Sequence, residues 1–267
     1  MNLDKNFFKE NIKTIIYALV IAIFIRSIFF QPFYIPSSSM EPNLLVGDRL
    51  FVSKYTYGYS KHSFPFSPNL FKGRFFFSEP KRGDVIVFKT PRDNRTDYIK
   101  RLIGLPGDEV KFIDGDLFIN NQQIFRTKIN KVHGEKINCG KEECIFFEEK
   151  ISNDITHITI YHNNNNLLKK IDESSFTEIF KFLKNNPWSI KGIGEIKFNV
   201  PKDHYFFMGD NRDNSSDSRV IGYVHKDNLV GKAQFLFFSS NREEGSIFKF
   251  WKWNKIIRFE RFFKKIK

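Results

Sequence analysis

An almost uncharged apolar segment lies near the N-terminus, from Thr14 to Phe30, and only Arg26 places a charge in it. A helix needs roughly 20 apolar residues to cross a bilayer core, so we expect a transmembrane helix over residues 14–31. Pro32 and Pro36 follow, and proline ends a helix because it lacks the amide that the next turn requires. A cleaved signal peptide has a similar order of features, but this segment exceeds a typical apolar h-region and no Ala-x-Ala-like site follows it closely. We therefore expect an uncleaved anchor.

Beyond the anchor, short apolar and β-branched runs alternate with turns. Leu105-Pro106-Gly107-Asp108 is a turn sequence, because proline fixes φ and glycine permits positive φ, and Asp114-Gly115 is typical of a β-hairpin turn. Short strands with frequent turns predict a mainly β fold. The expected strands lie within residues 43–52, 84–89, 97–104, 109–113, 116–120, 155–161, 195–200, 204–208, 222–224 and 231–238.

The chain divides by pattern into six parts. Residues 121–194 contain both cysteines, an asparagine run and a helix whose start carries a Ser175–Glu178 capping box, and we interpret them as an insertion. We expect a cytoplasmic N-terminus at 1–13, a transmembrane helix at 14–31, a β-domain in two parts at 32–120 and 195–245, the inserted subdomain at 121–194 and a basic amphipathic tail at 246–267.

The tail has the pattern of a helix that lies in a membrane interface, apolar on one side and basic on the other. Its apolar face carries Ile256, Phe259, Phe262, Phe263 and Ile266, and its polar face carries Arg258, Arg261, Lys264 and Lys265. The alternative is a charged helix that packs on the β-domain and faces solvent.

Charge sets the expected partners and topology. The net charge is +13, and residues 249–267 hold eight Lys or Arg against one Glu. With a membrane anchor present, anionic phospholipid is the expected partner of this basic tail and nucleic acid is not. Lys5, Lys9 and Lys13 precede the anchor, so the positive-inside rule places the N-terminus in the cytoplasm and Ser39 outside.

The two cysteines, Cys139 and Cys144, lie close together in the sequence, and no other cysteine competes with them. In an exported domain we expect a disulfide between them, the alternative being two unlinked thiols. A metal site is not expected, because a structural zinc site needs four ligands and only His133 lies nearby.

Three polar segments are candidates for chemistry. Ser37, Ser38 and Ser39 follow the anchor closely, although three serines beside a proline often form only a turn. Lys100 lies in the predicted strand 97–104 and shares a face with apolar neighbours, where burial would favour the neutral amine; by alternation alone, either Lys100 or Arg101 could face solvent. The polar segment 209–219 is either a solvated loop or a cross-linked framework, and it lacks the EF-hand spacing of a calcium loop.

Four segments together resemble bacterial type I signal peptidases, which are membrane-anchored endopeptidases with a Ser-Lys dyad. The segments are 36–42, 82–88, 98–108 and 209–219, and they occur in the family's order after an anchor. The resemblance covers most of residues 14–120 and 195–240. It implies a mainly β catalytic domain of the signal-peptidase type, with an N-terminal transmembrane helix and, from the pattern above, a C-terminal amphipathic helix.

The resemblance also implies a role for each matching residue. Ser39 would be the nucleophile and Lys100 the general base, with the Ser37 hydroxyl and the Ser39 amide forming the oxyanion hole. Ser215 would orient the lysine, and Asp217 and Arg219 would form a supporting ion pair. Ser38 departs from the pattern, since the family often has glycine there, and a serine would be strained if φ were positive.

The implied substrates are exported preproteins with small residues before the cleavage site, and no cofactor is expected. The implied location is the bacterial inner membrane, with one span and the catalytic domain on the outer side. Two alternatives remain at this stage. A self-cleaving Ser-Lys repressor shares the β-fold but carries a helix-turn-helix where this chain has an anchor. A membrane-tethered β-domain that binds lipid or a partner, without enzymatic activity, would make the serines structural.

Overall fold

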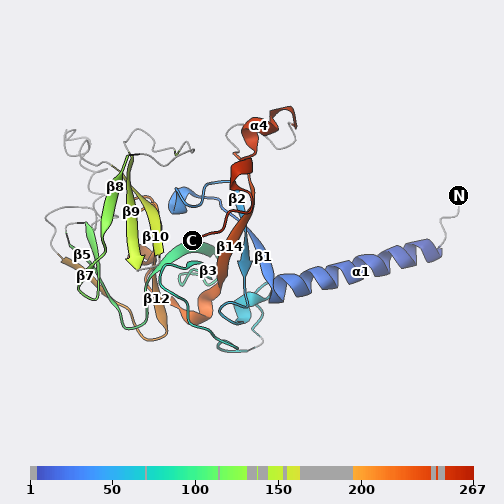
Figure 1. Ribbon diagram of the computed structural model, residues 1–267. Helices are drawn as coiled ribbons and strands as arrows, with labels where there is room; N and C mark the ends of the chain where they lie inside the picture. The colour runs from blue at the N-terminus through green and yellow to red at the C-terminus, as the bar shows by residue number, and fades with distance from the viewer. Residues whose placement is uncertain are drawn as a thin grey trace, which may run out of the picture.

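The computed structural model describes residues 5–69, 71–113, 115–130, 137, 144–152, 155–162, 195–241, 245 and 250–267. One long helix projects from a body built of β-sheets (Figure 1). The expected mainly β fold with an N-terminal apolar helix is therefore confirmed. The helix expected to start at the Ser175–Glu178 capping box lies outside the described residues. Cys144 is disulfide-bonded, and its expected partner, Cys139, lies outside the described residues.

Helix α1 spans Lys5–Ile28. Its segment Phe8–Ile28 has a mean hydropathy of 1.7 and is long and apolar enough to cross a membrane, and only 6% of its most apolar window is buried in the protein. A helix of this length measures roughly 36 Å, against a hydrocarbon core of roughly 30 Å. The helix starts before the expected boundary at residue 14 and ends at Ile28, ahead of Pro32, which lies in a strand.

Three antiparallel sheets form the body in the part of the chain that the structure describes. The seven-stranded sheet has the order β1 (Phe30–Tyr34), β2 (Asp48–Ser53), β14 (Leu229–Ser239), β3 (Val85–Lys89), β4 (Asp97–Gly104), β12 (His204–Met208) and β13 (Val224–His225). The four-stranded sheet has the order β11 (Glu195–Asn199), β5 (Glu109–Ile113), β6 (Asp116–Ile119) and β7 (Gln122–Gln123). The three-stranded sheet has the order β10 (Ile155–His162), β9 (Cys144–Ser152) and β8 (Arg126–Ile129). Most of these strands are rich in β-branched and aromatic residues, which favour strands. They overlap all of the strands expected from the sequence.

Strand β4 lies between β3 and β12, and apolar clusters cover both of its faces. Ile99, Leu102 and Ile103 each pack into a different one of three apolar clusters. Lys100 and Arg101 are therefore both buried, at 4% and 0% exposure. Neither side chain faces solvent, so both need polar partners inside the protein.

The prediction of an amphipathic helix over the tail, residues 246–267, is wrong for most of the part that the structure describes, where only short turns are helical. Helix α4 is a single turn, Trp253–Ile256, and the 3-10 turn η8 covers Phe259–Arg261. The chain then runs beside β14, where the amides of Phe263 and Ile266 donate to the carbonyls of Leu236 and Gln234 at 2.8 and 2.9 Å. Figure 1 accordingly places the C-terminus within the β body.

A buried ion pair explains why this segment is not a surface helix. The Arg261 Nη2 lies 2.6 Å from Asp48 Oδ2, and both side chains are at most 1% exposed. The same guanidinium donates to the carbonyl of Asn43. A helix with the expected polar face would leave Arg261 in solvent, whereas the observed path joins it to a carboxylate inside the domain.

Replacing Arg261 tests whether the tail is part of the folded domain. We expect Arg261→Met to lower the free energy of unfolding by about 3–5 kcal/mol, because Asp48 would keep a buried charge without its partner. Urea titration in detergent measures this. Lys264→Gln, an exposed charge in the same segment, serves as the control and should change stability by less than about 0.5 kcal/mol. Equal, small effects of both substitutions would show that the tail does not dock as described.

Candidate active site

The turn that carries Ser39 is anchored in the apolar core. Ser39 lies in the 3-10 turn η1 (Ser38–Met40), which follows β1 and Pro36. Met40, the next residue, is fully buried in the cluster formed with β2 and β14, and Leu44 is buried with it. These contacts hold the backbone, and the Ser39 side chain remains 8% exposed. Ser37 lies on the exposed side of the same turn, with its Oγ 3.4 Å from Ser39 Oγ.

Strand β4 brings Lys100 to Ser39. The Lys100 Nζ lies 2.6 Å from Ser39 Oγ and 2.9 Å from the carbonyl oxygen of Ile99. Burial lowers the pKa of Lys100 from 10.5 to about 8, because desolvation disfavours the ammonium form; Asp217 and Asp210 oppose this shift and Arg219 adds to it. The two residues expected to act together therefore meet in the structure, although they are 61 positions apart in the sequence.

The polar segment 209–219 is a cross-linked framework and not a solvated loop. Asp217 accepts two hydrogen bonds from the Arg219 guanidinium, each at 2.8 Å, and one from the Gly209 amide at 2.9 Å. Asp217 also caps the short helix α3 (Ser218–Ile221). Arg219 and these donors lower the pKa of the Asp217 carboxyl despite its burial. The expected Asp217–Arg219 ion pair is present.

This framework is hydrogen-bonded to the turn that holds the nucleophile. The Asn211 amide donates to the Ser39 carbonyl at 3.1 Å, and the Asn214 side chain donates to Ser38 Oγ at 2.9 Å. Ser38 lies in η1 and is not among the described residues with positive φ, so the serine adds a hydrogen bond and no backbone strain. The departure from the family's glycine therefore leaves the turn intact.

Ser215 lies beside Asp217 and Gly209 in the polar framework. Its hydroxyl is buried and lies close enough to Asp217 to help lower the pKa of that carboxyl. Within the part of the chain that the structure describes, however, this hydroxyl forms no hydrogen bond with Lys100. The expected Ser215–Lys100 hydrogen bond is thus not formed in this structure, and the Ile99 carbonyl accepts from the lysine.

A second buried ion pair, between Arg101 and Asp210, lies next to the site. This pair was not predicted from the sequence. The Arg101 guanidinium donates to both oxygens of Asp210, at 2.8 and 2.7 Å, and the Asn43 side chain donates to the same carboxylate at 2.8 Å. Arg101 adjoins Lys100 and Asp210 lies in the polar framework, so this pair joins β4 to segment 209–219. The alternation in β4 placed Arg101 on the opposite face from Lys100, but no pattern identified its partner.

The three-stranded sheet also supports the framework. The Ile160 amide on β10 donates to the Asp210 carbonyl, and the Arg212 amide donates to the Ile160 carbonyl, both at 2.9 Å. Arg212 and Glu149 form a buried ion pair across the same contact. Part of the expected insertion therefore holds the polar framework from the side opposite Ser39. Among the described residues, no group of three or more His, Cys, Asp or Glu side chains could hold a metal ion.

Comparison of the chain with known proteins identifies its family. The model of the family described as "Signal peptidase, peptidase S26" matches residues 8–238. The chain belongs to this family. The chain is 37% identical to signal peptidase I of Rickettsia typhi over an alignment of 270 positions, which covers 97% of this chain and 94% of the relative. It is 36% identical to signal peptidase I of Rickettsia prowazekii over 269 residues, with the same coverage.

A solved signal peptidase I from Enterococcus faecalis V583 covers 58% of this chain and 97% of its own, at 21% identity and a TM-score of 0.30. The family assignment rests on the family model and the relatives, and it confirms the resemblance seen in the sequence. As a signal peptidase, the chain is a membrane-associated serine endopeptidase that removes signal peptides from preproteins. A binding domain without enzymatic activity is not favoured.

Gly209 offers a test of the contact between the framework and the nucleophile turn. A Cβ at Gly209 would lie 2.5 Å from the Ser39 carbonyl oxygen and 2.2 Å from Ser215 Oγ, so both contacts must be relieved by movement of these groups or of Gly209 itself. A displacement of about 1 Å can cost roughly 100-fold in rate, and we expect Gly209→Ala to lower kcat by about that factor. Steady-state cleavage of a preprotein measures the change.

Gly104→Ala is the matched control, because Gly104 ends the strand that carries Lys100, and the three atoms nearest to its Cβ would be core side-chain atoms, at 2.9–3.0 Å. This variant should lose stability while its folded fraction keeps the wild-type kcat. A Gly209→Ala protein with wild-type kcat would show that the framework does not position Ser39.

Proposed function

We propose that Ser39 and Lys100 form the catalytic dyad of this signal peptidase. The observation that carries the proposal is the 2.6 Å contact between Lys100 Nζ and Ser39 Oγ in a buried site. A general base must lie within hydrogen-bond reach of the proton that it removes. A lysine can act in this role only when neutral, and burial lowers its pKa to about 8.

In the first step, the neutral Lys100 amine takes the proton from the Ser39 hydroxyl as Oγ attacks the carbonyl carbon of the scissile peptide bond. The resulting oxyanion is held by the Ser37 hydroxyl and the Ser39 backbone amide. Ser37 supports this role because its Oγ lies 3.4 Å from the attacking oxygen on the same turn. One such donor is usually worth roughly 3 kcal/mol of transition-state stabilisation.

In the second step, the Lys100 ammonium returns its proton to the leaving amine, and the signal peptide stays bound to Ser39 as an ester. Lys100 is then neutral again and removes a proton from the water that attacks this ester. It returns that proton to Ser39 Oγ as the ester bond breaks, and the signal peptide leaves with a free carboxyl group. Asp217 and Arg219 act as positioning residues through the Gly209 amide and the framework around it. Ser215 lies against Gly209 and beside Asp217, so in this proposal it acts on Lys100 through that pair.

The rate should depend on pH through Lys100. Its pKa is lowered in the folded protein to about 8, so the charged form predominates at lower pH and cannot accept a proton. The fraction of neutral lysine, and with it the rate, rises as the pH increases through this value.

We also propose one membrane span, with the N-terminus in the cytoplasm and the active site on the outer side of the bacterial inner membrane. Lys9 and Lys13 near the start of α1 support this orientation. The substrates would be exported preproteins with small residues before the cleavage site, and anionic phospholipid would attract the basic protein. Residues 32–120 and 195–245 act as one catalytic unit in this proposal, since their strands alternate in the seven-stranded sheet.

Substitution of the dyad tests the assignment. Purified protein in detergent is incubated with a preprotein that bears Ala-x-Ala before the cut, and the product is identified by N-terminal sequencing. We expect Ser39→Ala and Lys100→Met each to lower kcat at least about 10³-fold, because each removes one half of a unit that acts together. Both proteins should remain folded by circular dichroism.

The control is Lys128→Met, which removes an exposed lysine from β8, far from Ser39 in the sequence. It should cleave at the wild-type rate. Substantial turnover by purified Lys100→Met would reject the lysine as base, and a wild-type protein that cleaves no preprotein would instead favour the binding domain.

A further inference from the structure

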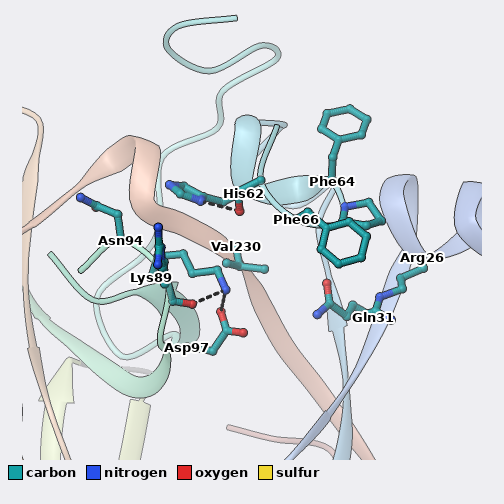
Figure 2. A pocket seen from close by; sticks show the side chains of 12 residues that line it. Arg26, Gln31, His62, Phe64, Phe66, Lys89, Asn94, Asp97 and Val230 are labelled. Carbon is teal, nitrogen blue, oxygen red and sulfur yellow. Dashed lines mark hydrogen bonds and ion pairs between the residues drawn. The ribbon is translucent and has the colours of Figure 1, made fainter. Parts of the chain in front are cut away.

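A cavity of about 430 Å³ lies where α1 enters the β-domain, away from Ser39. It is formed by the last turn of α1, the start of β1, the segment around the 3-10 turn η2 (Lys61–Ser63) and the turn between β3 and β4. Figure 2 shows Arg26 and Gln31 on one side, Phe64 and Phe66 above, and Lys89 with Asp97 at the centre. Its volume lies in the range of roughly 300–1,000 Å³ of ligand sites.

The lining of this cavity carries an excess of positive charge. Arg26, Lys89 and Arg95 contribute three cations, against the single carboxylate of Asp97. Lys89 is 2.8 Å from Asp97 and also donates to the Arg95 carbonyl (Figure 2). Within the described part of the chain, the guanidinium groups of Arg26 and Arg95 have no hydrogen-bond or ion-pair partner. Two planar donors are thus left for a ligand, and guanidinium groups bind phosphate oxygens in pairs.

The lowered pKa of the neighbouring Lys54 agrees with an excess of positive charge in the cavity. Lys54 is buried beside the cavity, and its Nζ donates to the Ser63 carbonyl. Its pKa is lowered to about 8, first by burial and then by the positive charge of Arg26, with Lys89 adding to the effect and Asp97 opposing it. Like charges at this site therefore repel one another, and an anion would relieve the repulsion.

The position of the cavity favours an amphipathic ligand. Arg26 belongs to the end of the apolar segment Phe8–Ile28. The Phe66 side chain on the cavity rim is fully exposed, and the apolar residues of α1 below it, such as Phe24 and Ile25, are about half exposed. An anionic group in the cavity would thus lie directly above apolar surface that faces lipid. A soluble anion could bind the cationic cavity but would not use the apolar surface of α1.

We propose that this cavity binds the headgroup of an anionic phospholipid, with the phosphodiester between the guanidinium groups of Arg26 and Arg95 and the acyl chains along α1. The net positive charge of the lining selects a phosphoglycerol-type headgroup over a zwitterionic one. This inference rests on α1 crossing the membrane, and it is independent of the roles assigned to Ser39 and Lys100.

A bound headgroup would fix the height of the active site above the membrane. Strand β4 begins with Asp97 at the cavity and carries Lys100 three residues later, and a strand rises about 3.3 Å per residue. Lys100 therefore lies roughly 10 Å along β4 from Asp97, the carboxylate that lines the cavity. A signal peptide is cut close to the membrane surface, so such a fixed distance would place Ser39 at the level of the cleavage site.

The experiment compares two arginines of the same turn. Arg95 lines the cavity, whereas Arg92 is exposed and directs its guanidinium to the Val220 carbonyl, outside the lining. Full-length protein in detergent is titrated with phosphatidylglycerol or phosphatidylcholine, and bound lipid is counted by native mass spectrometry. We expect the wild type to prefer phosphatidylglycerol, Arg95→Gln to bind it roughly fivefold more weakly, and Arg92→Gln to match the wild type.

The same variants are reconstituted in phosphatidylcholine vesicles with and without phosphatidylglycerol, and cleavage of a membrane-inserted preprotein is normalised to cleavage of a soluble peptide. The stimulation by phosphatidylglycerol should fall in Arg95→Gln and persist in Arg92→Gln. Equal losses of stimulation in both variants would mean that the stimulation depends on the overall surface charge of the protein. No loss of stimulation in Arg95→Gln would mean that the cavity binds no headgroup. Either result overturns the proposal.

A third measurement separates lipid from soluble phosphate. Inorganic phosphate is added at millimolar concentrations, and thermal unfolding of the wild type and Arg95→Gln is followed. We expect no stabilisation that depends on Arg95, because phosphate alone does not use the apolar surface of α1. Arg95-dependent stabilisation by phosphate, together with no retained phosphatidylglycerol, would assign the cavity to a free anion and contradict the lipid site.

Discussion

A lysine that is to act as a base must lose its proton near neutral pH, and the arrangement around Ser39 follows from that requirement. Burial on β4 supplies the shift, since the pKa of Lys100 falls to about 8 through desolvation. Burial of an amine is unfavourable unless its hydrogen bonds are satisfied, and Ser39 Oγ and the Ile99 carbonyl provide the acceptors. The contact that holds the lysine is thus also the contact that activates the serine.

Paired charges surround this lysine, and the pairing keeps its environment close to neutral. Arg101 is bound to Asp210 and Arg219 to Asp217, each through two hydrogen bonds within the protein. An unpaired carboxylate at either position would stabilise the ammonium form of Lys100 and raise its pKa. Removing one partner of such a pair costs roughly 3–5 kcal/mol, so the same pairs also hold segment 209–219 against the nucleophile turn.

Much of this arrangement could be predicted from the sequence, because it depends on local patterns. The anchor follows from one apolar run, the strands from alternation, and the dyad from four segments in a fixed order. The rest depends on distant partners. Arg261 and Asp48 are 213 positions apart, so a helical pattern in the tail gave no sign that Arg261 would be buried. Asp210 is likewise 109 positions from Arg101. The strand expected at 155–161 is present as β10, but its contact with segment 209–219 was not indicated by the sequence, and β9 was not expected. Ser215 shows that a matching residue does not guarantee the expected hydrogen bond.

The central claim is that the fold keeps Lys100 neutral at a pH where a free lysine is charged. The most direct measurement is the pKa of its side chain, followed by NMR of protein labelled with ¹³C at lysine Cε and assigned by comparison with Lys100→Met. The account predicts one resonance, absent from that variant, that titrates near pH 8. An ordinary lysine titrates near pH 10.4. A Lys100 resonance that titrates at that ordinary value in the folded enzyme would contradict the account.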